Sequence, residues 1–139
     1  MLNRFDLPSR LVVPEWFLLS SLQLSWLDAE KFCKENKGAL LSINSEAEQR
    51  FVYQSMAVNK TLWIGLVKDR GLQKFRWSTG EKLTYQNWIR GEGSISGHED
   101  CGEMTDYSVF RGQWNDKSCS AKQPYICEKG EVKFGNYLV

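Results

Sequence analysis

The spacing of hydrophobic residues along the chain changes near residue 60. Between residues 26 and 56, apolar side chains recur every three or four positions, as on the buried face of an amphipathic helix. Beyond residue 60 they form short runs or alternate with polar residues, which is typical of strands. Helices followed by antiparallel strands predict an α+β domain.

Two serines mark the starts of the predicted helices. Ser25 is followed three positions later by Asp28, and Ser45 by Glu48, so each pair has the pattern of a capping box. The first helix is expected to stop at Gly38. The apolar stripes of the two helices are Trp26, Ala29, Phe32 and Cys33, and Ala47, Phe51, Val52 and Met56. We interpret both stripes as core, which places Cys33 on a buried helix face.

The predicted strands are short. A buried first strand is expected at Trp16–Leu19, and further strands at 62–66, 74–78, 109–114 and 124–128. Residues 87–101, which precede the last two strands, are rich in glycine and polar side chains. Loops of that length are usually functional or disordered.

The composition is that of an ordinary globular domain: 139 residues, with 42% hydrophobic and 25% charged side chains. A net charge of +1 gives no basis for binding nucleic acid or an anionic membrane. No apolar run approaches the roughly 18 residues that span a bilayer, and residues 1–15 lack the apolar core of a signal peptide. We therefore expect no nucleic-acid partner and no membrane contact within this chain, while a signal, stalk or anchor outside it is left open.

Four cysteines permit three disulfide pairings, and the absence of a C-x-x-C pair makes a zinc cluster a poor fit. One hypothesis joins Cys33 to Cys127 across a long loop and Cys101 to Cys119 across a short one. The segment Asn59-Lys60-Thr61 is an N-glycosylation sequon, so Asn59 is a glycosylation candidate. Disulfides and a sequon both favour an extracellular protein.

Acidic and amide side chains stand next to the second pair of cysteines. Glu99 precedes Cys101 by two positions, and Asn115 and Asp116 precede Cys119. A bridge between these cysteines would bring the three side chains to one end of a short loop. Carboxylate and amide oxygens suit calcium, which takes about 6–8 oxygen ligands. The pattern therefore predicts a metal-dependent binding site.

In their order along the chain, these features resemble the C-type lectin-like domain family. The blocks that carry the resemblance are residues 26–33, 39–46 and 63–66, then Asn87-Trp88, Glu99-Asp100-Cys101, Trp114-Asn115-Asp116 and residues 125–128. One tripeptide would be weak evidence, but the whole series of blocks is specific. The resemblance covers residues 16–128, which leaves 1–15 as an N-terminal extension and 129–139 as a C-terminal tail.

The resemblance implies the fold class: an α+β double-loop fold with two helices, two small antiparallel sheets and a long loop region that carries the calcium site. It also implies the disulfides Cys33–Cys127 and Cys101–Cys119, in the short form of the domain that lacks an additional amino-terminal pair. Trp63 is expected to pack in the core, and Gly65 to allow a close backbone approach.

In sugar-binding members of the family, one calcium is held by a Glu-Pro-Asn or Gln-Pro-Asp tripeptide, a glutamate before the third cysteine and an Asn-Asp pair after tryptophan. Carried over residue by residue, the metal ligands are Glu92, Glu99, Asn115 and Asp116, and Ser94 stands in place of the family's amide. The alternative is that Glu92 is a solvated loop residue and that Asn115 and Asp116 only hold the loop by hydrogen bonds.

The first element of that site is altered in this chain. Gly93 replaces the family's cis proline, so the Glu92–Gly93 peptide is expected to be trans, because a non-proline cis bond costs about 2.5–4 kcal/mol. The hydroxyl of Ser94 is a poorer calcium ligand than an amide, so weakened calcium binding is expected. Replacing Gly93 and Ser94 with proline and asparagine is expected to strengthen it.

Other polar residues near the site receive less weight. Lys68 and Leu72 stand where the family's auxiliary calcium site has acidic ligands, so at most one well-formed calcium site is predicted. His98 is interpreted as a solvated loop histidine, with a pH-sensing role as the alternative. Arg90 and Lys117 are interpreted as solvated surface charges, with a contact to an anionic sugar or a protein ligand as the alternative.

Two functions follow. The first is a calcium-dependent carbohydrate-binding (lectin) domain that coordinates sugar hydroxyls directly to calcium, and Glu92 favours mannose-type glycans. The second is a calcium-independent domain of the same family for a protein or other non-sugar ligand.

An enzyme is not expected, because the chain has one histidine and neither a nucleophile elbow nor a metalloprotease motif. The expected partners are glycans or glycoproteins, and the expected location is extracellular, as a secreted protein or a receptor ectodomain; the oligomeric state is left open.

Overall fold

The structure is a computed structural model that describes residues 13–107 and 109–132. Its helices are α1 (Trp26–Glu35) and α2 (Glu46–Val52), and α2 continues into the π-helical turn η2 (Tyr53–Ala57). The strands are β1 (Val13–Leu24), β2 (Ala39–Leu40), β3 (Leu62–Asp69), β4 (Lys74–Trp77), β5 (Cys101–Thr105), β6 (Gln113–Lys117) and β7 (Gln123–Val132). Residues 1–12 of the predicted extension and 133–139 of the predicted tail lie outside the described residues. Within the described part, no helix has both the length and the apolar character that crossing a membrane requires.

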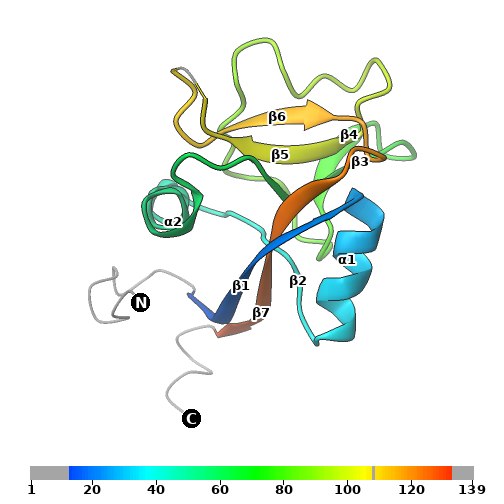
Figure 1. The fold of residues 1–139 in the computed structure, drawn as a ribbon. Coiled ribbons are helices and arrows are strands. Elements are labelled where there is room, and N and C mark those ends of the chain that lie inside the picture. Colours follow the sequence, from blue (N-terminus) through cyan, green and yellow to red (C-terminus); the bar gives the residue numbers. More distant parts are fainter. Residues whose placement is uncertain (1–12, 108, 133–139) are drawn as a thin grey trace.

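The described strands form two antiparallel groups that share one sheet (Figure 1). In the first group, β1 and β2 pair with β7. In the second, β4 and β5 pair with β3, and β6 pairs with β5. The groups meet where β3 pairs with β7 in parallel, with Trp63 opposite Tyr125. The predicted α+β fold is confirmed, and the two expected sheets are joined here into one mixed sheet.

Both predicted helix starts are confirmed by their caps. The Ser25 hydroxyl accepts a hydrogen bond from the backbone N–H of Asp28 at 3.2 Å, and the Ser45 hydroxyl accepts one from that of Glu48 at 3.1 Å. Each serine thus satisfies a backbone donor that the first helical turn leaves free. The Glu48 side chain also accepts the backbone N–H of Asn44 at 2.7 Å, which fixes the approach to α2.

Two glycines allow backbone segments to pack closely. A Cβ atom on Gly38 would lie 2.3 Å from the carbonyl oxygen of Glu128, so a side chain there would separate the end of α1 from β7. A Cβ on Gly65 would lie 2.8 Å from the carbonyl oxygen of Leu40, as the sequence prediction expected. The glycine at position 38 is therefore required by the close approach to β7. The left-handed backbone conformation after α1 belongs to Lys37, which has φ 65°.

The core beneath the long loop is built from aromatic rings. Trp114 of β6 is fully buried and packs edge-on against Trp77, Tyr85 and Trp88, with ring centroids 5.3–5.8 Å apart. Its indole N–H donates to the side-chain oxygen of Gln49 on α2 at 2.9 Å. Large rings with one satisfied polar atom bury much apolar area in rigid contacts. This packing fixes β6, and thereby the residues that follow Trp114, against α2.

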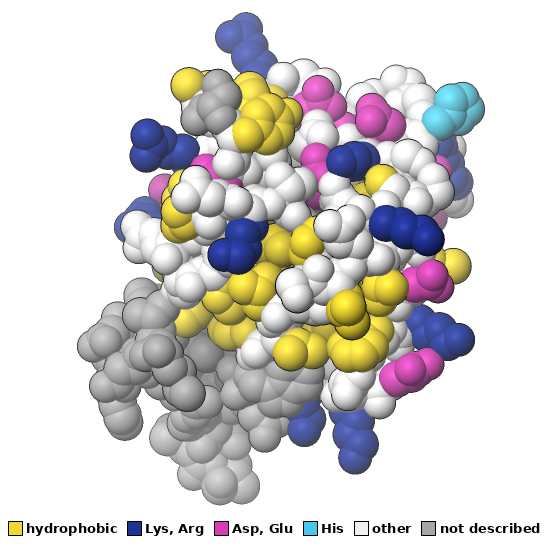
Figure 2. Space-filling model, viewed as in Figure 1, with side chains coloured by type: hydrophobic (Ala, Val, Ile, Leu, Met, Phe, Trp, Pro, Cys, Tyr) yellow, Lys and Arg dark blue, Asp and Glu magenta, His cyan; other side chains and the backbone are white. Residues whose placement is uncertain are grey.

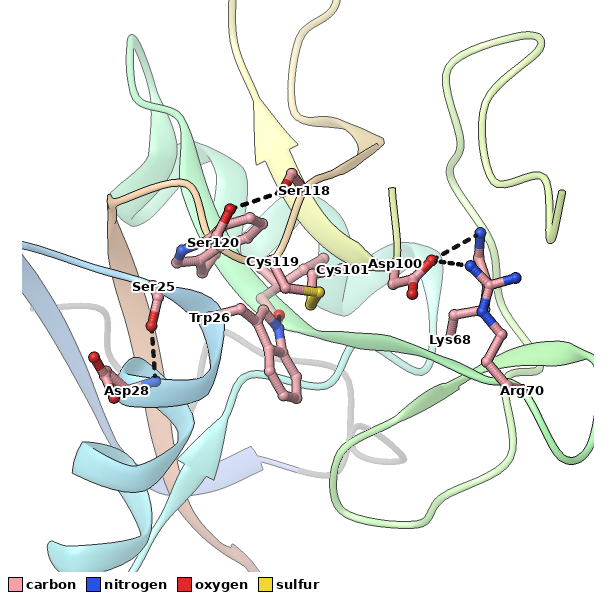
Figure 3. The surroundings of a disulfide bond; sticks show 12 residues. Ser25, Trp26, Asp28, Lys68, Arg70, Asp100, Cys101, Ser118, Cys119 and Ser120 are labelled. Carbon is pink, nitrogen blue, oxygen red and sulfur yellow. Dashed lines mark hydrogen bonds and ion pairs between the residues drawn. A yellow bond between two sulfur atoms is a disulfide. The ribbon is translucent and has the colours of Figure 1, made fainter. Parts of the chain in front are cut away.

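Both proposed disulfides are present. Cys33 is bonded to Cys127 and Cys101 to Cys119, with Cα atoms 5.5 and 5.2 Å apart. The second bond ties the start of β5 to the residues after β6, next to Trp26 at the start of α1 (Figure 3). Trp26 donates its backbone N–H to the Cys119 carbonyl oxygen at 3.0 Å. The short covalent loop is therefore anchored to the helix.

Two predicted strands differ in the structure. The strand expected at 109–114 begins only at Gln113, because Val109 is 74% exposed and Gly112 adopts φ 81°, which belongs to a turn. The first strand was expected to be buried. It is only half-buried at Phe17–Ser20, because β1 pairs with β7 alone.

Candidate functional site

The segment between β4 and β5 carries the first predicted ligand and arches beyond β5 and β6 (Figure 1). It is held to β6 by two backbone hydrogen bonds of 2.8 Å: Ile89 donates to Trp114, and Trp114 donates to Asn87. Glu92 then donates its N–H to the Ile89 carbonyl oxygen at 2.9 Å, with Gly91 at φ 89°. A turn with positive φ at its third residue favours glycine there. The local sequence thus turns the chain so that Glu92 reaches β6.

Three predicted carboxylates meet at this point. Each of Glu92, Glu99 and Asp116 offers an oxygen within 4.8 Å of the others. Asp116 is only 5% exposed, and its Oδ1 atom has no hydrogen-bond partner among the described residues. A buried carboxylate oxygen without a donor is unfavourable unless a proton or a cation compensates for it. The arrangement therefore suits a cation with oxygen ligands.

The proximity of the carboxylates changes the proton affinity of Glu92. Its pKa is raised to about 7, first by hydrogen bonding to Asp116, then by desolvation, and then by the negative charges of Asp116 and Glu99. Like charges at short distance disfavour full ionisation of a cluster. Without a cation, Glu92 thus holds a proton over much of the acidic pH range.

The other two predicted site residues have partners of their own. The side-chain N–H of Asn115 donates to Glu103 Oε2 at 2.8 Å, and only the amide oxygen of this side chain can coordinate a cation. The Ser94 hydroxyl lies 2.7 Å from the Ser96 hydroxyl within the loop. The structure therefore places Glu92, Glu99 and Asp116 together, and directs Asn115 toward β5 and Ser94 toward its own loop.

Gly93 is constrained by its neighbour in space. The Glu92–Gly93 peptide is trans, as expected, since no described peptide is cis. Gly93 has φ 79°, and a Cβ atom there would lie 2.6 Å from the indole ring of Trp88. The loop therefore passes directly over Trp88, which requires a residue without a side chain.

Arg70, which the sequence prediction did not single out, binds the second half of the loop (Figure 3). Its guanidinium donates to the Ile95 carbonyl oxygen at 3.1 Å, to the Gly97 carbonyl oxygen at 2.6 Å and to the carboxylate of Asp100. Lys68 adds an ion pair, with its Nζ 3.3 Å from Asp100 Oδ1. Burial opposes the charge of Asp100, but hydrogen bonds from Arg70 and Lys68 outweigh it and hold the pKa of this carboxyl below its usual value. The chain itself thus supplies the cations next to Asp100.

Two further residues near the site also differ from expectation. Lys117 was interpreted as a solvated charge, but its Nζ donates to Gln123 Oε1 at 2.7 Å and lies 3.7 Å from Glu103 Oε1. Glu103 itself was missed, although it is two residues after Cys101 and directly opposite Asn115 in the β5–β6 register. A hairpin drawn back from the Cys101–Cys119 bond would have paired Glu103 with Lys117, two positions from the observed register. Arg90 and His98 are exposed, as expected. The upper part of the face in Figure 2 carries both acidic and basic side chains.

Replacing Arg70 with alanine is expected to loosen residues 95–100 without unfolding the domain. Three loop contacts depend on its guanidinium, and the residue is exposed, so its loss costs local order rather than core packing. We expect amide hydrogen exchange of residues 95–100 to accelerate at least tenfold. The variant Arg50→Ala, which removes only an exposed pair with Glu46 on α2, is the control. Unchanged amide exchange in Arg70→Ala would contradict the role of Arg70 and Lys68 as a clamp on residues 95–100.

The amino-acid sequence matches the model of the lectin C-type domain over residues 22–129. The chain is 31% identical over 109 residues to human lithostathine-1-beta, covering 75% of this chain and 65% of that protein. It is also 31% identical over 135 residues to the human secretory phospholipase A2 receptor, covering 93% of this chain but 9% of the receptor. The chain thus spans less than two thirds of the length of either relative.

Solved structures with the same fold include different kinds of binder. The mouse scavenger receptor C-type lectin carbohydrate-recognition domain is 30% identical with a TM-score of 0.73, covering 84% of this chain and 88% of that chain. A calcium-independent type II antifreeze protein is 26% identical with a TM-score of 0.74, covering 84% and 86%. The cow CD23 carbohydrate-recognition domain, solved in the presence of a GlcNAc2Man3 oligosaccharide, is 30% identical with a TM-score of 0.70, covering 81% and 85%.

The family-model match extends over most of the chain, and it agrees with the order of the sequence blocks, the two disulfides and the fold. Lectin C-type domains are binding domains without enzymatic activity. The chain therefore belongs to the C-type lectin domain family.

Proposed function

We propose that this domain binds carbohydrate through one calcium ion held by Glu92, Glu99 and Asp116, with the amide oxygen of Asn115 as a further ligand. The observation that carries the proposal is the meeting of three carboxylates around Asp116, whose buried Oδ1 has no donor among the described residues. Calcium prefers oxygen ligands of this kind, and a cation relieves the repulsion among them. The carbohydrate-recognition domains with the same fold support the proposal.

A calcium ion bound there would offer coordination positions to two neighbouring sugar hydroxyls. The chain's own contribution is the orientation of hydrogen-bonding groups around those hydroxyls. Glu92 supplies acceptors and favours mannose-type glycans, as in the sequence prediction. One of the two N–H donors of Asn115, however, is already used by Glu103. We therefore expect selectivity among hydroxyl geometries to be modest, because one directional donor is committed inside the protein.

The second candidate function is calcium-independent recognition of a protein or other non-sugar ligand. The fold similarity to a calcium-independent antifreeze protein supports it. So does the clamp of Arg70 and Lys68, which orders residues 95–100 without a metal ion.

Calorimetric titration separates the two functions. The domain is titrated with calcium and then with mannose- and galactose-type glycans, each with and without a chelator. Calcium heat and chelator-sensitive glycan binding are expected. Absence of calcium heat, or glycan binding that a chelator leaves unchanged, would contradict the calcium-dependent function and favour the calcium-independent one.

Calcium affinity is expected to fall with decreasing pH. Glu92 must lose a proton to bind calcium, and its pKa of about 7 means that protons compete below neutrality. The affinity should drop about tenfold per pH unit between pH 7 and 5 and level off above pH 8. The measurement is calcium titration at several pH values, in buffers of different ionisation heat that count the released protons. Glu92→Gln should bind calcium more weakly and lose most of this pH dependence; an equally steep profile in that variant would assign the proton elsewhere.

When calcium is absent, the same proton on Glu92 makes the folding stability fall as the pH rises. The folded state holds the proton of Glu92 more tightly than the unfolded chain, whose carboxyl has its usual pKa of 4.5. The associated stability is therefore complete below pH 4.5 and is lost as the pH rises to about 7. Calcium would remove this loss.

The setting of the domain also belongs to the proposal. Two disulfides agree with an oxidising, extracellular location, and we propose a secreted protein or a receptor ectodomain. Asn59 is exposed in the turn before β3, which suits a glycosylation site. We retain residues 16–128 as the domain, and glycans or glycoproteins as its partners.

A further inference from the structure

A hollow of about 460 Å³ is lined in part by the loop that carries Glu92. It is formed by the β3–β4 turn, by β4 and by the segment from Gly80 to Ile95. This volume falls within the usual range of small-molecule sites, about 300–1,000 Å³. None of the residues assigned to the calcium site lines it.

The surface of this hollow has an apolar part that remains open to solvent. It includes Leu72, Leu83, Trp88 and Ile95, while Phe75, which also lines the hollow, is buried beneath Trp88. Leu72 is 61% exposed, and Trp88 packs on Phe75 with ring centroids 4.8 Å apart. The indole N–H of Trp88 is satisfied by Gln86 at 3.0 Å, so the ring offers apolar contact rather than a free donor. Such a surface suits the flat apolar side of a ring.

Positive charge surrounds this apolar surface. Lys74 and Lys82 line the hollow, and neither forms an ion pair with a described residue. Arg76 is the third lining cation, but its guanidinium is paired with Asp69 at 3.4 Å. The lining of the hollow thus includes two lysines without an ion pair to a described residue, in a molecule whose net charge is only +1.

The one lining carboxylate is turned to other partners. Glu81 Oε1 accepts from the hydroxyls of Ser42 at 3.1 Å and Thr79 at 2.9 Å, and Oε2 accepts from the Asn44 amide at 3.0 Å. These neutral donors leave the negative charge of Glu81 in place, but three cations and one carboxylate line the hollow, so the lining carries a net charge of +2. Charge complementarity therefore favours an anion.

We infer that this hollow binds an acidic saccharide, with its sulfate or carboxylate groups on Lys74 and Lys82 and its ring on the apolar surface. The hollow includes Gly93 and Ile95 of the loop that carries Glu92, so such a ligand would lie beside the proposed sugar site. Binding here uses no calcium ligand. It can therefore succeed or fail independently of the proposed calcium-dependent function.

The test is a titration of the whole chain, in a chelator, with a sulfated uronic-acid disaccharide and with cellobiose as the neutral probe. Two-dimensional NMR follows the Trp88 indole N–H and the Gly93 amide. We expect the sulfated probe to shift both signals, cellobiose to bind at least tenfold more weakly, and added salt to weaken binding. The variant Lys74→Gln/Lys82→Gln should bind at least about tenfold more weakly, since two charge-assisted contacts are lost.

The matched control is Lys31→Gln/Lys34→Gln, which removes the same charge from exposed positions on α1. It should bind the sulfated probe as the unmodified chain does. Equal binding of cellobiose, equal losses in both double variants, or no shift at Trp88 and Gly93 would each overturn the inference. Tighter binding of decanoate than of the disaccharide would also overturn it, because an acyl anion would then be the better fit.

Discussion

Replacing Asp116 with asparagine is expected to lower calcium affinity about 100-fold or more, because it removes the buried carboxylate around which the site is formed. Asn would keep the size of the side chain and one oxygen, but not the charge. Calorimetric titration with calcium measures the effect. Glu35→Gln on α1 is the control, since it removes one exposed carboxylate far along the chain from the site.

For the calcium-free protein, the same substitution is expected to leave the thermal stability unchanged or to raise it. Glu92 and Glu99 repel Asp116, and Asp116 Oδ1 has no hydrogen-bond donor among the described residues. The negative charge of Asp116 therefore destabilises the calcium-free folded state. In a chelator, Asp116→Asn should therefore unfold at the same temperature as the unmodified chain or a higher one. A variant that lost both calcium binding and stability would mark Asp116 as a structural residue. Calcium binding that survived the substitution would remove it from the ligand set.

The sequence was most informative where a residue's role is fixed locally or covalently. The helix caps at Ser25 and Ser45 depend on residues three positions away, and both are present. The two disulfides and the family could be inferred because cysteines and motif residues keep their order along the chain. Gly65 could be assigned a close approach on the same basis, and the structure supplies the Leu40 carbonyl that it meets.

The contacts that the sequence did not predict depend on strand register and on loop paths. Lys117 and Asn115 both contact Glu103, and this follows from the pairing of β5 with β6 rather than from their neighbours in sequence. Arg70 reaches Ile95 and Gly97, 25 and 27 positions away. No periodicity in the sequence specifies such contacts. The structure brings Glu92, Glu99 and Asp116 together, and their binding of calcium stays a prediction.

Gly93 provides the sharpest contrast between the sequence and the structure. From the family pattern, proline and asparagine at positions 93 and 94 were expected to strengthen calcium binding. In the structure, Gly93 has φ 79°, whereas proline holds φ near −65°. Its missing side chain is also the reason that the loop can lie on Trp88. The substitution therefore meets a backbone and a packing obstacle at the same residue.

We accordingly expect Gly93→Pro/Ser94→Asn to weaken calcium binding at least tenfold and to destabilise the fold by roughly 2 kcal/mol, from backbone strain and displacement of Trp88. Ser94→Asn alone, which leaves Gly93 and Trp88 in place, should bind calcium at least as tightly as the unmodified chain. Calcium titration and thermal unfolding of the two variants give both quantities. Stronger binding by the double variant would mean that the loop can take another path around Trp88.

A comparison of two alanine variants separates the two obstacles. Gly91 has φ 89°, similar to Gly93, but a Cβ there would meet no atom within 4 Å. Gly91→Ala therefore measures the cost of positive φ alone, expected at about 1 kcal/mol. Gly93→Ala adds the contact with the Trp88 ring and should cost more. The difference between them measures how firmly Trp88 fixes the loop; equal values would mean that the indole yields freely, and that the position of Glu92 is set by the Ile89–Glu92 turn instead.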